Sequence, residues 1–151
     1  TKISTTIKSE INKKFIESTN YRLWYYQKIS TASTTKNINK IEKELYDAFG
    51  PIPIETTTLL NIAKTRIVCF ETKIEQIFIT ESSVEIFLAK NKKEALDSLF
   101  FDSVQSFKHA NLGGHLFKKS KNGNPGIVLY IKKTSGLFSL LFSFVDLFKD
   151  A

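Results

Sequence analysis

The sequence predicts an α+β fold in which amino-terminal helices lead into a small, mostly antiparallel sheet packed with helices. Between residues 35 and 70 apolar residues recur every three or four positions, which is the period of a helix. Between residues 74 and 88 they alternate, which is the period of a strand with one buried face. Helical spacing returns at residues 137–148. A chain of 151 residues is long enough to close a hydrophobic core of its own.

The beginning of the chain is polar and rich in lysine, with only isolated apolar residues. This pattern predicts an extended arm over residues 1–20 that lies on a single domain formed by residues 21–151. Aromatic residues and Leu23 recur at helical spacing over residues 21–30, which predicts a first helix. The small hydroxyl residues that follow are suited to capping the next helix.

A second helix is predicted over residues 35–49, because Ile38, Ile41 and Leu45 are three or four positions apart and share one face. Gly50 and Pro51 end it, since proline cannot continue the hydrogen-bond ladder. The stiff corner that this predicts consists of Phe49, Gly50, Pro51, Ile52 and Pro53. A third helix should follow over residues 54–71, with a buried face formed by Leu59, Leu60, Ala63, Ile67 and Phe70.

The remaining elements are read from changes of period and from turn residues. A hairpin is predicted over residues 74–80 and 84–88, followed by a helix over 91–107 that opens with a capping box, Asn91 with Glu94. A glycine turn is predicted at residues 113 and 114, and a second hairpin joins residues 116–119 to 126–132. A last amphipathic helix is expected over residues 137–148; it needs an apolar partner, and core packing is favoured over a membrane surface because its polar face carries aspartates.

The charge balance permits a nucleic-acid partner without pointing to a site for one. The net charge is +7, from 22 Lys and Arg against 15 Asp and Glu, but the lysines are spread along the chain. The densest group, Lys118, Lys119 and Lys121, falls in a predicted turn. A solubilising surface is therefore the favoured interpretation, and a direct nucleic-acid-binding module is the alternative.

Composition also indicates the setting of the protein. One cysteine cannot form a disulfide framework or a zinc cluster, which indicates a reducing, cytoplasmic environment. A secretory signal and a stretch long enough to span a bilayer are both lacking, so we expect a soluble protein without a membrane partner. The chain contains no methionine and opens at Thr1, which suggests a fragment of a longer protein.

No enzyme site can be assembled from these residues. The sequence has no glycine-rich phosphate loop, and His109 and His115 stand six apart with no evident third ligand for a metal. Cys69 lies in an apolar run with no base beside it, as a small core residue would. The carboxylate pairs fit solvated helix surfaces. We therefore predict no catalytic residue, no metal ligand and no cofactor in this chain.

A series of motifs between residues 15 and 66 carries a family resemblance. In order, these are Phe15-Ile16, Arg22-Leu23 with Tyr26, residues 41–47, the corner at 49–53, Leu59-Leu60 with Ile62-Ala63, and Arg66. Their order and spacing resemble the carboxy-terminal domain of bacterial transcription-repair coupling factors. In the helix that precedes the corner, Ala48 stands where the family has arginine. Beyond residue 73 the resemblance is limited to the order of the elements.

The resemblance implies a regulatory role within a multidomain machine. Such proteins displace stalled RNA polymerase from damaged DNA, recruit the repair protein UvrA, and bind ATP, Mg²⁺ and DNA through motor domains elsewhere in the parent. Their carboxy-terminal domain docks on a UvrB-like module of the same chain and masks its UvrA-binding surface. Glu44 and Asp47 match positions that the family uses for this docking. Without the resemblance, Glu44 and Asp47 would be interpreted as solvated carboxylates near a helix end.

Overall fold

The chain forms two compact units in the computed structural model, which describes residues 1–70, 72–89 and 102–149. One unit combines Thr1–Thr6 with Cys69–Ala151, and the other consists of Ile7–Val68. The second unit is therefore an insertion, since the chain leaves the first unit after Thr6 and returns to it at Cys69. The division into an arm of residues 1–20 and a single domain of residues 21–151 stays a prediction.

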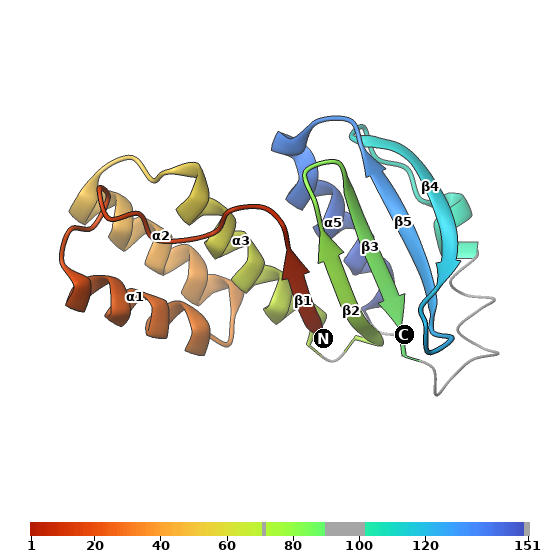
Figure 1. Cartoon of the computed structure of the whole chain (residues 1–151), viewed down its shortest axis with the longest axis horizontal. Helices are drawn as coiled ribbons and strands as arrows, with labels where there is room; N and C mark the ends of the chain where they lie inside the picture. Colours follow the sequence, from red (N-terminus) through yellow and green to blue (C-terminus); the bar gives the residue numbers. More distant parts are fainter. Residues whose placement is uncertain (71, 90–101, 150–151) are drawn as a thin grey trace. The chain divides into compact units, whose positions relative to one another are not determined.

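The inserted unit is helical and contains α1 (Thr19–Thr31), α2 (Thr35–Phe49) and α3 (Ile54–Cys69) (Figure 1). The first two helices begin at hydroxyl caps, because Ser18 accepts from the Tyr21 N–H and Thr34 accepts from the Asn37 N–H. The predicted bounds of α2 are confirmed. Helix α3 ends at Cys69, so Phe70 does not continue its buried face. Phe70 is 77% exposed, and its predicted place in the core is wrong.

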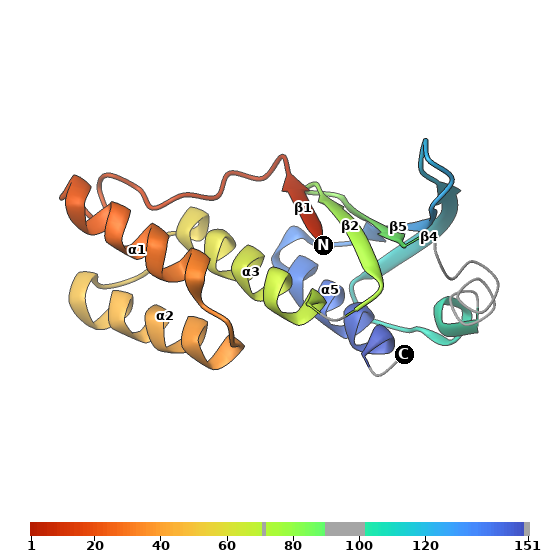
Figure 2. The same ribbon diagram turned by 90° about the horizontal axis from the view of Figure 1, so that it is seen from below.

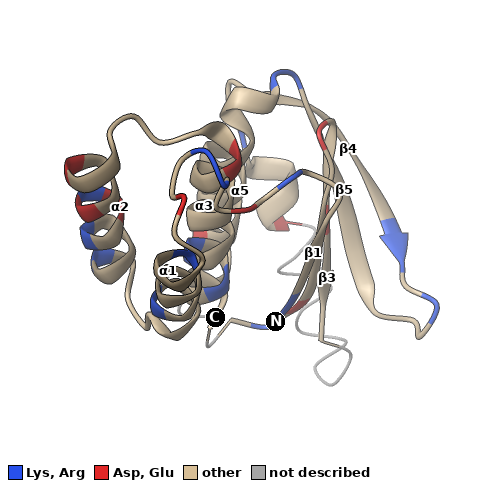
Figure 3. Cartoon of the chain, turned by 60° about the vertical axis from the view of Figure 1, so that its left-hand side comes forward, with Lys and Arg blue, Asp and Glu red and all other residues tan. Residues whose placement is uncertain are grey.

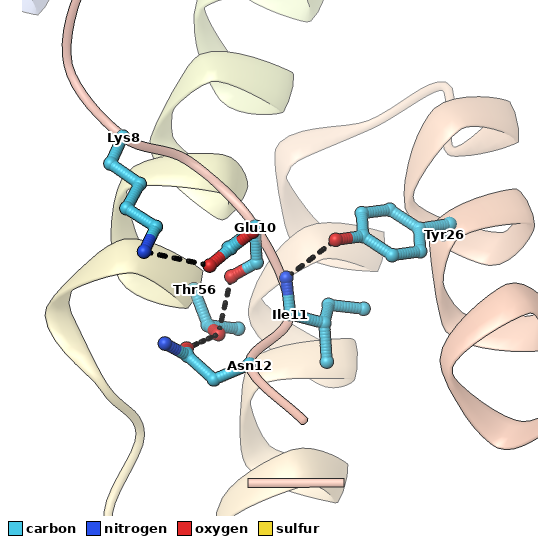
Figure 4. Close-up of polar contacts among 6 residues, drawn as sticks. All are labelled: Lys8, Glu10, Ile11, Asn12, Tyr26 and Thr56. Atoms are coloured by element: carbon cyan, nitrogen blue, oxygen red, sulfur yellow. Dashed lines mark hydrogen bonds and ion pairs between the residues drawn. The ribbon is translucent and has the colours of Figure 1, made fainter. Parts of the chain in front are cut away.

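Residues 7–18 cross the helices as an irregular segment with a turn at residues 13–15, and specific contacts hold it in place (Figure 4). The Ile11 N–H donates to the Tyr26 hydroxyl at 2.7 Å, and the Thr56 hydroxyl donates to the Glu10 carbonyl at 2.8 Å. Ile11 belongs to the core of this unit. The other members of that core are Ile16, Tyr25, Ile29, Ala32, Ile38, Ile41, Leu45, Leu60 and Ala63.

The other unit is built on a mixed sheet. Its described strands are β1 (Lys2–Thr5), β2 (Ile74–Ile79), β3 (Ser83–Leu88), β4 (Leu112–Lys119) and β5 (Pro125–Ile131), in the order β1-β2-β3-β5-β4. Strand β1 pairs parallel with β2, and the remaining neighbours pair antiparallel. The α+β fold and the mostly antiparallel sheet are therefore confirmed.

One face of this sheet is covered by α5 (Leu137–Val145), as Figure 2 shows. Short 3-10 helices precede and follow α5, so residues 146–148 of the predicted last helix are wound more tightly. The apolar stripe is buried as expected of a core helix. The side chains with 0% exposure in this core are Ile77, Ile79, Val84, Ile86, Leu88, Ile127, Leu129, Leu140, Leu141, Phe144 and Val145.

Gly113 and Gly114 lie within β4, at a register shift against β5, so the predicted turn is wrong. A β-bulge accommodates the extra residue there, and Gly114 adopts φ +148°. The helix predicted over residues 91–107 falls mostly on residues 90–101, which lie outside the described residues. Residues 102–106 are helical.

Candidate docking surface

The two predicted docking residues lie on the side of α2 that does not enter the core. Ile38, Ile41 and Leu45 are buried, and this fixes how the helix is turned. Asp47 is exposed, and Glu44 is partly exposed one turn before it. Figure 3 shows the acidic positions of α2 toward the end that leads into the corner, and its lysines toward the start.

Glu44 is already engaged within its own unit. Its Oε2 atom lies 2.6 Å from the Nζ atom of Lys28 on α1, and the two side chains retain 37% and 34% exposure. The same Lys28 ammonium lies 4.7 Å from the ring centroid of Trp24. A continuous cluster across α1 and α2 is thus formed by Trp24, Lys28 and Glu44. The ion pair with Lys28 occupies part of the Glu44 carboxylate, whereas Asp47 faces solvent.

The charge of Glu44 also acts on the neighbouring core. Burial raises the pKa of the Tyr25 hydroxyl, and the negative charge of Glu44 raises it further. The Tyr25 ring contacts Trp24 edge to face at 4.8 Å and Phe49 at 6.1 Å between centroids. The ionic cluster therefore rests on an aromatic layer that continues to the corner.

The predicted corner residues combine packing with an unusual backbone. The Phe49 ring also contacts Phe15, at 5.7 Å between centroids. Gly50 adopts φ +86° and ψ −159°, and its N–H donates to the Tyr46 carbonyl. The Pro53 carbonyl accepts from the N–H groups of Thr56 and Thr57, which starts α3. Pro51 lies between Gly50 and the start of α3, so the chain reverses direction within a few residues.

Two arginines from the resemblance hold the helices together. The Arg22 Nη1 atom donates to the carbonyls of Ile16 and Glu17, at 2.6 and 2.8 Å. Arg66 donates to the carbonyls of Ile29 and Ala32, at the end of α1. Both guanidinium groups therefore satisfy backbone acceptors at helix ends or turns, which is a structural role.

Sequence reasoning missed the exposed aromatic residues of α1 and α2. Tyr21, Trp24 and Tyr46 are 58%, 50% and 58% exposed. Large aromatic side chains at a solvent-exposed position are enriched at binding surfaces. The available signal was the spacing of Tyr21, Trp24 and Lys28, which places them along one side of α1.

The lysine group considered for nucleic acid lies at the β4–β5 hairpin. The Lys118 ammonium is 2.6 Å from the Glu85 carboxylate, so its charge is partly neutralised. It also lies 5.8 Å from the Phe87 ring centroid. Lys119 and Lys121 are exposed. The hairpin thus presents two exposed lysines next to an ion pair.

The chemistry-bearing residues elsewhere are not assembled into a site within the described ranges. There, no group of three or more His, Cys, Asp or Glu residues is placed to hold a metal ion. A His109 ring nitrogen lies 3.3 Å from the Ser139 hydroxyl, and His115 stacks edge to face on Phe117. Burial raises the pKa of Cys69 to about 11, which disfavours the thiolate. Over the part of the chain that is described, no helix has the length and apolarity needed to span a bilayer.

Comparison with known proteins gives one consistent result. Residues 5–99 match the family model described as the TRCF domain. The transcription-repair-coupling factor of Escherichia coli is 36% identical over 66 residues, which is 44% of this chain and 6% of that protein. The factor from Rickettsia prowazekii is 28% identical over 81 residues, or 54% of this chain and 7% of that protein. The chain therefore spans under a tenth of either relative.

A solved structure extends the similarity over nearly the whole chain. It is described as the crystal structure of the C-terminal domain of transcription-repair coupling factor, and it superposes with a TM-score of 0.76. The superposition covers 97% of this chain and 90% of that one, at 17% sequence identity. At this identity the likeness establishes the shared fold.

Proposed function

The chain belongs to the TRCF domain family, and on that premise we propose that it is a regulatory, protein-binding domain of a transcription-repair coupling factor. Its partner is the UvrB-like module of the same parent chain. Docking covers the surface by which that module binds UvrA, so the resting parent is held in an inhibited state. Engagement of the parent with stalled RNA polymerase releases the contact.

The wider chemistry belongs to the parent. ATP and Mg²⁺ bind in its motor domains, DNA is contacted through that motor, and the parent works in the cytoplasm without a membrane partner. This domain contributes no catalytic residue and no cofactor of its own. Its role is to contribute binding free energy that stabilises one arrangement of the parent.

The observation that carries the proposal is the placement of charge on α2. The first turn of this helix contains no acidic residue, its last turn contains no basic one, and Asp47 lies in that last turn. A negative charge near a helix carboxyl end opposes the helix dipole and costs roughly 0.3–1 kcal/mol. An exposed residue that weakens its own helix is better accounted for by binding than by folding.

Arginine is the side chain that this surface fits best. Carboxylates accept bidentate, charge-assisted hydrogen bonds from a guanidinium group, and exposed aromatic rings stack on its plane. Glu44 and Asp47 supply the carboxylates, and Trp24 supplies a ring beside Glu44. The UvrB-like module binds UvrA through arginines. When Glu44 and Asp47 bind those same arginines, this domain covers the module and competes with UvrA.

The test is a double substitution in the full-length parent. Glu44→Ala with Asp47→Ala should raise both UvrA affinity and basal ATP hydrolysis, because the inhibited arrangement loses its ionic contacts. Glu42→Ala is the matched control, since it removes a carboxylate from the same helix on a different side. Unchanged UvrA binding in the double variant would remove these residues from the mechanism.

Direct binding to nucleic acid is the competing function. It rests on the net charge and on the hairpin lysines, of which Lys118 is already paired with Glu85. Titration of this chain with duplex DNA at two salt concentrations separates the two functions. Affinity that falls steeply with salt would support phosphate contact and count against a purely protein-binding role.

A further inference from the structure

The cluster of Trp24, Lys28 and Glu44 has the form of a cation site that is filled by a residue of the chain itself. The Lys28 ammonium lies 2.6 Å from the Glu44 carboxylate and 4.7 Å from the Trp24 ring centroid. One side of the cation is thus contacted by a negative charge and another by an aromatic face. This pairing is the arrangement by which proteins bind guanidinium and ammonium groups.

We propose that Lys28 is an internal substitute for an arginine of the docking partner, and that docking displaces it. In the bound state the partner's guanidinium would contact Glu44 and stack on Trp24, while Lys28 turns into solvent. This inference rests on the proposed function, since it names how the partner is recognised at the same surface. It adds two residues, Trp24 and Lys28, that the family resemblance does not supply.

Geometry makes the exchange feasible. The three side chains are partly exposed, so none must leave a buried position: Trp24 is 50% exposed, and the Lys28 and Glu44 side chains are 34% and 37% exposed. Glu44 and Lys28 also line an open groove between α1 and α2, with a volume of about 280 Å³. A partner side chain can therefore approach the Glu44 carboxylate from solvent.

The chemistry favours arginine over the resident lysine. A guanidinium group is planar, binds a carboxylate through two parallel hydrogen bonds, and is less strongly hydrated than an ammonium group. The ammonium of Lys28 is a compact charge on a flexible stem and can reorient in water. Because one cation replaces another, part of the docking free energy is offset by the lost internal pair. Lys28 would therefore keep the contact weak enough to open.

The experiment measures binding of the purified UvrB-like module to this chain and its variants. Lys28→Gln should bind two- to fivefold more tightly, because the internal competitor is absent. Trp24→Leu should bind two- to fivefold more weakly, and Trp24→Phe should lie between it and the unsubstituted chain because an aromatic face remains. Lys36→Gln is the matched control, since it removes a lysine from the first turn of α2, away from Trp24. Trp24 is the only tryptophan in the chain, so its emission should also change when the module binds.

The outcomes separate this inference from the function it rests on. Lys28→Gln binding that is unchanged, weaker, or strengthened no more than in Lys36→Gln would overturn the displacement. So would Trp24 emission that the module does not alter. If Glu44→Gln with Asp47→Asn abolishes binding while the Lys28 and Trp24 variants bind normally, only the displacement fails. A module that does not bind the unsubstituted chain would refute the proposed function and the displacement together.

Discussion

Replacement of Gly50 by alanine isolates the conformational cost of the corner. Gly50 adopts φ +86° and ψ −159°, a region that is open essentially to glycine alone. A Cβ added there would meet no atom within 4 Å, so no steric clash contributes. The backbone strain is about 1–3 kcal/mol. Alanine also restricts the unfolded chain, which offsets about 0.4–1 kcal/mol. With the middle values of these two contributions, about 2 and about 0.7 kcal/mol, we expect the free energy of unfolding of the helical unit to fall by about 1.3 kcal/mol.

Urea denaturation followed by Trp24 emission measures this loss, because the single tryptophan lies in the helical unit. With an m value of about 1.5 kcal/mol per molar urea, the midpoint should fall by about 1 M. Gly50→Asn is the informative control. Asparagine tolerates the left-handed helical region but not this ψ, so it should destabilise the unit as much as alanine. A loss for Gly50→Ala below about 0.5 kcal/mol would refute the argument from backbone strain.

Three further predictions concern other positions. Asp47→Lys removes an unfavourable charge and adds a favourable one, so it should stabilise the helical unit by about 0.6–2 kcal/mol, measured by the same denaturation, while it abolishes docking; a destabilised variant would contradict the helix-dipole argument. Gly126→Ala should destabilise the sheet unit by about 1–3 kcal/mol, since its Cβ would lie 2.6 Å from the Phe87 Cε1 atom. Phe87→Leu in the same chain should recover part of that loss in a double-mutant cycle, and full additivity would rule out the clash. The raised pKa of Cys69, about 11 against 9.0, means that the unfolded state loses its proton first as pH rises. Stability should therefore fall between pH 9 and 11 relative to Cys69→Ala, by at most about 1.4 kcal/mol per pH unit, and parallel curves for the two chains would exclude this effect.

The parts of the fold that sequence predicts are those with local causes. The bounds of α2 follow from a hydroxyl cap at Thr34 and a glycine at position 50, both within a few residues of the helix ends. The strand β1 was not foreseen, because three of its four residues are polar and its partner β2 lies more than 70 positions away. The turn predicted at Gly113 and Gly114 is wrong for a related reason. Glycine marks either a turn or a bulge, and only the pairing with the partner strand decides between them.

The candidate docking surface was likewise predictable only where its causes are local. The spacing of Glu44 and Asp47 on one helix is a local property, and it placed both carboxylates on the surface of α2. The pairing of Glu44 with Lys28 depends instead on which side of α1 packs against α2. Helix α1 gives little periodic signal for that choice, because its exposed side carries Tyr21, Leu23 and Trp24. Apolar residues there do not mark the core.

The insertion of the helical unit between β1 and β2 also ties the integrity of the sheet to that of the helices. While residues 7–68 are folded, the two ends of the insertion are held at a fixed separation. If they unfold, β1 becomes tethered through a loose loop, whose closure costs roughly 4 kcal/mol of chain entropy. Release of β1 would leave one edge of β2 unpaired, and an unpaired edge is a template for pairing between molecules. A change that unfolds only the helices should therefore cause aggregation through the unpaired edge of β2.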